Sequence, residues 1–320
     1  MVEQLQMLCE SFIRNRDIIK DEFKWDNQYI IPVCACTFTE KGVIINAERL
    51  KQCQKLLKEN TSVFSDFRSY TELPMITMLA ADADPAKRLS DTLAIYDIIK
   101  RYFRGGSYAA LISAMVSGMT TVRNAEQTAA RGKAIHEMMK QAHPFLTDGE
   151  DSVFAVLMAF SPKNDQQLFE DMEACYSLLR KFAGDNNSAQ RISHVLALYE
   201  GAPEEKCARV KALYDMLAKS RRKYGKYYEL SVLACLAMTA PDLNGAAAQI
   251  VHADNFLDVQ KGYSGLGIDK KTRTMHAAMI ASCLYPAPNI QTTALTGTIA
   301  MIAAQYTAMM CTLVAVNAAT

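Results

Sequence analysis

The segment from residue 211 to residue 219 reads KALYDMLAK, and three close copies precede it in the chain. They read LAIYDIIKR at 93–101, KAIHEMMKQ at 133–141 and EACYSLLRK at 173–181, so the steps are 40, 40 and 38 residues. Apolar residues recur within each copy at offsets of three and four, which is the spacing of one helix face rather than of a strand. The recurrence therefore predicts amphipathic helices in a tandem repeat of about forty residues.

A second apolar segment lies upstream of each copy, and another follows the last one. These segments carry few charges and alternate small with large residues: ITMLAAD, ALISAMVSG, VFAVLMAF, HVLALYEG and SVLACLAMTA. Short breaks rich in proline and acids follow them, as in DADPAKR, FSPKND, GAPEEK and TAPDLN. Proline and acids suit the first turn of a helix. Each unit is therefore predicted to be a helical hairpin, with an inner, more buried helix followed by an amphipathic one.

Each copy also carries an alanine followed two positions later by tyrosine or histidine. We expect the alanine to let neighbouring helices approach closely, and the ring to lie at the edge of the buried stripe. In the degenerate unit near residue 250, Asp254 takes the tyrosine position. The four alanines are Ala94, Ala134, Ala174 and Ala212.

No linker or low-complexity run divides the repeats, so one continuous domain over 1–320 is expected. It consists of a leader helix in 1–27, hairpin repeats over 28–285 and an uncharged C-terminal helical segment over 286–320. The predicted fold class is all-α: hairpins of about forty residues in an α-solenoid or α/α array of the HEAT-like kind. The pattern leaves open whether the array is an open solenoid or a closed toroid.

The C-terminal segment is rich in Ala, Met and Thr and has no Asp, Glu, Lys or Arg from residue 274 onward. It is long enough to cross a bilayer. Gln305, Asn317, many alanines and the lack of flanking basic residues favour a packing helix over a membrane anchor. The sequence does not decide whether this segment packs within the chain or between two chains of an oligomer.

The composition excludes a strong electrostatic field over the whole molecule, because 35 Lys and Arg are balanced by 34 Asp and Glu, which gives a net charge of +1. Nine cysteines, an odd number, and a first segment that mixes charge with apolar residues favour a reducing cytoplasm.

Acidic residues gather in the turns on one edge of the predicted array. Such an edge would suit an α/α-toroid enzyme with catalytic carboxylates. Each acid also lies at or beside a helix start, where capping favours acids, and we prefer that interpretation. The residues are Asp82, Asp84, Asp165, Glu204, Glu205 and Asp242.

Two basic stretches, KSRRKYGKYY at 219–228 and GYSGLGIDKKTR at 262–273, could contact an anion or a nucleic acid. We favour a basic helix C-terminus for the first and an inter-repeat loop for the second. The candidate contacts are Lys219, Arg221, Arg222, Lys223, Lys226, Lys270, Lys271 and Arg273.

We expect no metal site and no cofactor. Cys34 and Cys36 form a lone C-x-C, and the five histidines lie scattered along the chain. No catalytic signature occurs either. The sequence thus favours a non-catalytic binding or scaffold protein with a protein or peptide partner, with the toroid enzyme and the nucleic-acid binder as alternatives.

The stretch FSDFRSYTELPMITMLA at 64–80, the aligned Ala-x-Tyr helices and the Ala-rich uncharged tail together resemble an uncharacterised bacterial domain-of-unknown-function family, typical of Firmicutes. The resemblance implies a cytoplasmic bacterial protein. It implies no activity and assigns no functional residue.

Overall fold

The computed structural model describes residues 2–24, 26, 28–68, 71–263 and 267–285, and every regular element in them is a helix. The all-α prediction is confirmed for this part of the chain. The helices are α1 (Val2–Glu22), α2 (Ile30–Glu40), α3 (Ala47–Asn60), α4 (Glu72–Ala80), α5 (Pro85–Tyr102), α6 (Ser107–Val116), α7 (Val122–Ala142), α8 (Gly149–Met158), α9 (Asp165–Leu179), α10 (Asn186–Ala197), α11 (Pro203–Lys219), α12 (Glu229–Thr239), α13 (Leu243–Asp258) and α14 (Lys270–Ser282).

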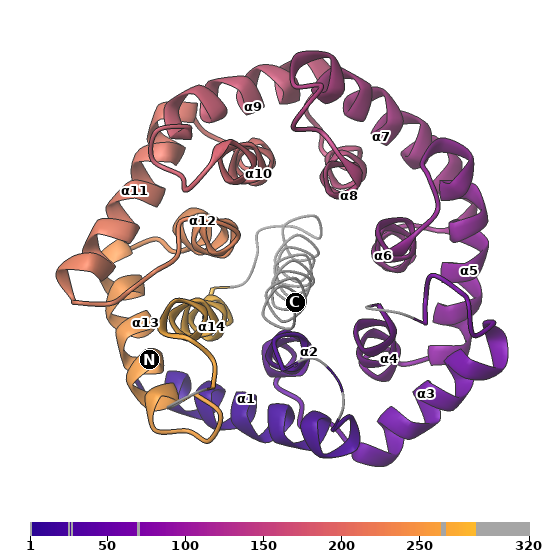
Figure 1. Cartoon of the computed structure of the whole chain (residues 1–320), viewed down its shortest axis with the longest axis horizontal. Coiled ribbons are helices and arrows are strands. Elements are labelled where there is room, and N and C mark those ends of the chain that lie inside the picture. Colours follow the sequence, from indigo (N-terminus) through magenta and orange to yellow (C-terminus); the bar gives the residue numbers. More distant parts are fainter. Residues whose placement is uncertain (1, 25, 27, 69–70, 264–266, 286–320) are drawn as a thin grey trace, which may run out of the picture.

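The helices form two concentric rings, with the odd-numbered helices outside and the even-numbered helices inside (Figure 1). The ring closes on itself, because α1 packs against α13 and α14, and α14 also packs against α2. At the seam, His252 Nε2 lies 3.4 Å from Gln6 Oε1, and the Arg16 guanidinium lies 5.4 Å from the centre of the Tyr263 ring. The described helices therefore make a closed α/α ring.

The hairpins run one helix out of phase with the predicted ones. Each outer helix packs most extensively on the inner helix that follows it, as α1 does on α2 and α9 on α10. The segment predicted as a separate leader is therefore the outer helix of the first pair. A forty-residue period fixes the length of the unit but not the point at which the unit begins, which explains the difference.

Outer helices bury one stripe of apolar side chains. In α9 the stripe runs through Leu168, Met172, Cys175 and Leu179, at steps of four, three and four residues. Such spacing keeps the side chains on one face, and burial of that face holds the helix against the inner ring.

The shared alanine is not the close-packing position, which corrects the expectation above. Ala94 and Ala134 are exposed, whereas the residues that follow them, Ile95 and Ile135, are buried. One residue turns a helix by about 100°, so a stripe through Ile95 leaves the preceding alanine outside it. Close approach depends instead on Gly132, where an added Cβ would lie 2.8 Å from Val156 Cγ2 of α8.

The tyrosine or histidine of each copy is half-buried, and its ring packs against the loop that enters the neighbouring inner helix. The ring pairs are Phe67–Tyr96, Phe103–His136, His143–Tyr176 and Phe182–Tyr214, with centroids 4.7 to 5.8 Å apart. In α13 the same place is filled by Asp254, which binds Arg222 from the preceding loop. An ion pair there replaces two aromatic rings.

Arginines on outer helices bind the carbonyl ends of inner helices. Arg131 of α7 donates to the backbone oxygens of Ala159 at 2.9 Å and Ser161 at 2.8 Å, beyond the end of α8. Arg209 of α11 donates to Ala237 O at 2.9 Å in α12. A cation suits the negative end of a helix dipole and satisfies carbonyls without intrahelical partners.

No helix in the described ranges is both long and apolar enough to cross a membrane. The predicted helical segment over 286–320 lies outside the described residues.

Candidate functional site

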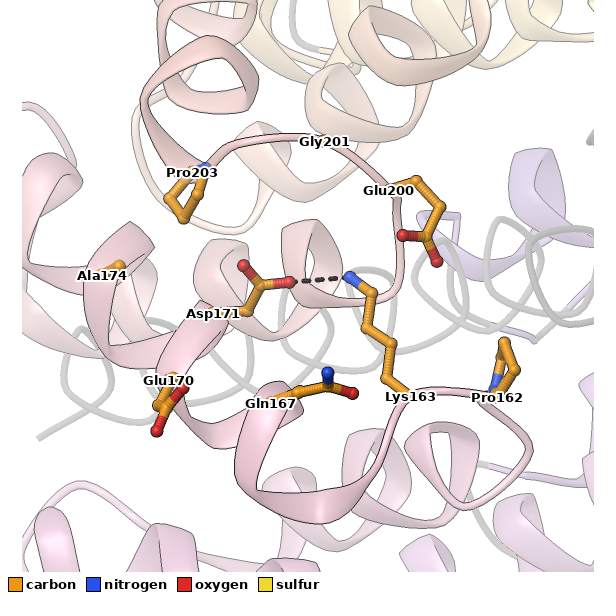
Figure 2. Close-up of a pocket in the computed structure, with 9 residues that line it drawn as sticks. All are labelled: Pro162, Lys163, Gln167, Glu170, Asp171, Ala174, Glu200, Gly201 and Pro203. Carbon is orange, nitrogen blue, oxygen red and sulfur yellow. Dashed lines mark hydrogen bonds and ion pairs between the residues drawn. The ribbon is translucent and has the colours of Figure 1, made fainter.

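The edge of the ring where inner helices end carries an open pocket of about 620 Å³ (Figure 2). It lies between the turn that precedes α9 and the turn that precedes α11. The residues around it are Pro162, Lys163, Gln167, Glu170, Asp171, Ala174, Glu200, Gly201 and Pro203.

A charge reversal in the repeat builds this pocket. Asp171 occupies in α9 the place that Arg131 has in α7 and Arg209 has in α11, four residues before the central buried side chain. An aspartate cannot bind carbonyl oxygens, so lysines do so here instead. Lys163 Nζ donates to Ala197 O at 3.1 Å and to Tyr199 O at 2.9 Å, at the end of α10.

Asp171 holds two lysines in place. Its Oδ2 accepts from Lys163 Nζ at 2.7 Å and from Lys206 Nζ at 3.2 Å. Lys206, on α11, is buried and also donates to Tyr199 O at 3.1 Å. Both ammonium groups are thus bound by the protein itself, and the pair provides little attraction for an outside anion.

The carboxylates at the pocket mouth are less engaged. Glu170 and Glu200 are both exposed. Glu170 accepts a 2.8 Å hydrogen bond from Gln166, and Glu200 has no ion pair or hydrogen bond with a described residue. Asp171 is neutralised by its lysines, so Glu170 and Glu200 make the pocket mouth acidic, with proline and alanine as its apolar walls.

A second polar group lies buried inside the ring, where α8 and α10 begin. Arg191 of α10 donates to both carboxylate oxygens of Glu150 in the first turn of α8, with 3.0 Å between Nη2 and Oε2. Both side chains are about nine-tenths buried. Two aligned, charge-assisted hydrogen bonds offset part of the cost of removing these charges from water.

Asp151 and His194 lie beside this ion pair. Burial, with repulsion from Glu150 and Asp148, raises the pKa of Asp151 to about 8, and burial, with the nearby Arg191 charge, lowers the pKa of His194 to about 3. Asp151 Oδ2 accepts from the Asp148 N–H at 2.7 Å, and Oδ1 lies 3.3 Å from His194 Nδ1. Burial thus favours the neutral form of both groups, a protonated Asp151 carboxyl and an unprotonated His194 ring.

The cavity next to this buried cluster measures about 50 Å³ and is lined in part by Asp148, Glu150 and Gln190. A water molecule needs about 30 Å³, so the cavity has no room for a sugar or peptide. In this conformation the cluster is a buried structural network, and the rim pocket has the room for a ligand that this small cavity lacks.

The two predicted basic stretches converge on one buried aspartate. Arg273 donates to Asp254 Oδ1 at 2.8 Å, and Arg222 donates to Oδ2 at 2.9 Å. Lys226 places its ammonium 4.5 Å from the Phe182 ring and 5.0 Å from the Tyr214 ring. These three cations are therefore used within the fold. The remaining candidates are exposed: Lys219, Arg221, Lys223, Lys270 and Lys271.

The acids predicted for the turn edge act at separate helix starts. Asp84 accepts from Lys87 N at 3.0 Å and Asp242 accepts from Gly245 N at 2.9 Å, as N-caps of α5 and α13. Asp165 begins α9 and pairs with Arg131 at 2.8 Å. These helices lie apart around the outer ring (Figure 1), so the three carboxylates do not gather in one pocket.

Within the described ranges, no three His, Cys, Asp or Glu side chains are grouped as metal ligands would be. Cys34 is buried in α2, and Cys36 follows it on the same helix.

Sequence reasoning missed both the rim pocket and the buried cluster, although each left a signal. Aligning the repeats places an acid, Asp171, where arginines stand in the neighbouring units. The signal for the buried cluster is the presence of charged residues, such as Glu150 and Arg191, in the otherwise apolar inner segments. A charged residue in a helix that is buried on all sides needs a partner of opposite charge, so these residues predict an ion pair between inner helices.

Comparisons with known proteins bear out the resemblance that the sequence suggested. Residues 15–310 match a family model described as "Protein of unknown function (DUF4003)". The "Uncharacterized protein YeaA" of Bacillus subtilis (strain 168) is 23% identical over 233 residues, which cover 70% of this chain and 70% of that protein. No solved structure matches the chain. The family match covers most of the sequence, and the chain belongs to the DUF4003 family.

Proposed function

We propose that this protein is a non-catalytic binding protein that holds a basic segment of a partner protein or peptide in the rim pocket. One observation carries the proposal: in the pocket of about 620 Å³, Asp171 and Lys163 are paired with each other, and the two remaining carboxylates, of Glu170 and Glu200, are exposed at the mouth. Its volume lies within the range of sites that hold small ligands.

The charges of the pocket favour a cation. Lys163 is bound by Asp171 and by two carbonyl oxygens, which leaves Glu170 and Glu200 to set the potential at the mouth. A lysine or arginine side chain offers a charged head to these carboxylates and an apolar stem to Pro162 and Pro203.

The walls of the pocket are held in place before a partner arrives. Gln167 is fixed by a capping box with Asn164, and Asp171 by its two lysines. Proline restricts the backbone in both turns. A pocket that changes little on binding spends less free energy on ordering, which supports recognition of a flexible segment.

We also propose that the seven outer–inner pairs among the described helices are repeats of one HEAT-like helical unit, and that the protein works in the cytoplasm. The buried stripes that recur from α3 to α13 support a common unit. Free thiols at the eight described cysteines support a reducing compartment.

The alternatives receive less support. A toroid enzyme would need carboxylates that close on a substrate in an enclosed cavity. In the rim pocket Glu170 and Glu200 are exposed and Asp171 is bound by two lysines, and the buried cluster adjoins only about 50 Å³. A nucleic-acid binder would use the basic stretches, in which Arg222 and Arg273 are bound to Asp254.

The test is binding of a short fluorescein-labelled peptide rich in lysine and arginine, followed by fluorescence anisotropy at low salt. Replacing Glu170 and Glu200 together by Gln is expected to weaken binding by about tenfold, since each exposed ion pair contributes about 0.2–1 kcal/mol. The matched control replaces Glu48 and Glu59 of α3 by Gln, which removes the same charge elsewhere on the ring and should leave the affinity unchanged.

A glutamate-rich peptide of the same length should not bind. The proposal fails if the two double variants weaken binding equally, because the attraction would then come from overall charge rather than from this pocket.

A further inference from the structure

Two cysteine thiols from neighbouring outer helices meet beneath the rim. Cys175 lies in the buried stripe of α9 and Cys207 in the second turn of α11, and both are buried. The Cys207 thiol donates to the carbonyl oxygen of Cys175, with 4.0 Å between Sγ and O. We propose that Cys175 and Cys207 form a reversible disulfide when the protein meets a hydroperoxide.

The surroundings of the pair divide the roles of the two thiols. Interaction with the neighbouring Cys207 thiol lowers the pKa of the Cys175 thiol, and the ammonium groups of Lys206 and Lys163 lower it further, against burial and Asp171. Interaction with Cys175 and burial raise the pKa of the Cys207 thiol, and the ammonium groups of Lys211 and Lys206 oppose this. Since the thiolate is the nucleophile, Cys175 attacks first.

Five other described cysteines differ from Cys175 in the direction of their pKa shift. Burial raises the pKa of Cys9, Cys34, Cys36, Cys53 and Cys283. A buried thiol that stays protonated reacts slowly with peroxide.

The reaction is a two-electron oxidation in two steps. The Cys175 thiolate attacks the terminal oxygen of the hydroperoxide; the O–O bond breaks, Cys175 becomes a sulfenic acid, and the alkoxide leaves with the proton that Cys175 lost. The sulfur of Cys207 then attacks the sulfur of Cys175; the S–O bond breaks, the S–S bond forms, and hydroxide leaves as water with the proton of Cys207. Two thiols and one hydroperoxide thus give one disulfide, one alcohol and one water.

The experiment treats the reduced, folded full-length protein with hydrogen peroxide, blocks the remaining thiols with N-ethylmaleimide, and maps non-reduced tryptic peptides by mass spectrometry. We expect peptide 164–180 joined to peptide 207–209, at the loss of two hydrogens, and separated again by dithiothreitol.

Variants distinguish the roles. Cys207→Ser should stop at a sulfenic acid on Cys175 that dimedone traps, Cys175→Ser should leave Cys207 reduced, and Cys53→Ser, on α3, should still form the link. The wild-type map decides even if a variant fails to fold. The proposal is overturned if both thiols remain alkylated by N-ethylmaleimide after peroxide treatment, or if either cysteine links to a different one.

Discussion

Replacing Asp254 by Asn is expected to destabilise the protein by about 3–5 kcal/mol, as measured by urea unfolding at neutral pH, because it removes the buried carboxylate that Arg222 and Arg273 share. Asp254 is 0% exposed and accepts hydrogen bonds from Arg273 at 2.8 and 3.1 Å and from Arg222 at 2.9 Å. Arg273 is itself buried, so its charge cannot turn to water.

The matched control is Asp258→Asn. Asp258 also pairs with Arg273, but its side chain is 55% exposed, so this carboxylate is largely hydrated, unlike that of Asp254. Its loss should cost less than about 1 kcal/mol. Removing a buried cation together with its partner, in the double variant Asp254→Asn, Arg273→Met, should restore part of the lost stability. Equal effects of the two single substitutions would show that Asp254 is not the buried centre of this network.

Replacing Asp151 by Asn is expected to stabilise the protein relative to wild type as the pH rises. The pKa of Asp151 is raised from 3.8 to about 8 in the folded state, chiefly by burial. Below pH 3.8 the group is protonated in both states; between these values the unfolded chain releases its proton and the folded one keeps it, so rising pH favours unfolding. Above about pH 8 the effect levels off.

An asparagine at this position keeps the geometry without the titration, since its oxygen can accept from Asp148 N–H and its amide can donate to His194 Nδ1. His194 titrates in the unfolded chain near its ordinary pKa of 6.5, so measurements above that pH isolate Asp151. Each pKa unit corresponds to about 1.4 kcal/mol, so the variant should gain about 2 kcal/mol relative to wild type between pH 6.5 and about pH 9.

The control for this series is Asp185→Asn, at the exposed N-cap of α10, where Asn caps as well as Asp. Free energies of unfolding from urea titrations at each pH give the comparison. A stability difference between wild type and Asp151→Asn that stays constant over this range would mean that Asp151 is ionised in the folded protein.

The outer ring was largely predictable from the sequence because burial on one face imposes a period that survives divergence. The buried stripe through Leu213 and Leu217 has the same spacing as that through Ile135 and Met139, and both can be recognised in the sequence. Which face of each outer helix is buried could not be predicted, since the shared alanine stands one position away from the buried residue. Helix phase depends on side-chain contacts that the repeat does not record.

Closure of the ring could not be predicted, because it depends on a small rotation between successive pairs and on contacts between residues far apart in the chain. The first outer helix, α1, is also difficult to recognise as part of the repeat. Asn15 stands at its central buried position, where it accepts from Ile45 N at 2.9 Å and donates to Val43 O at 2.9 Å. A polar residue at this position interrupts the apolar stripe through Phe12 and Ile19, so the repeat is harder to detect in the sequence.

The rim pocket was partly predictable. The turns at FSPKND and GAPEEK were identified as helix starts, and Pro203 does begin α11. The sequence could not show that Lys163 and Lys206 both bind the Asp171 carboxylate, because that contact joins residues from different units.

The closed ring is the central claim, and a cross-link across its seam tests it most directly. Cysteines placed at Gln6 and His252, whose side chains meet at 3.4 Å, should be joined within one chain by a short bismaleimide. A cysteine pair at Gln6 and Gln127, on α1 and on α7 across the ring, should not be joined (Figure 1). A 6–252 link in the monomer, found by peptide mapping, is the predicted result. Two cysteines that each react with a monofunctional maleimide and yet never link would mean that the chain is an open array.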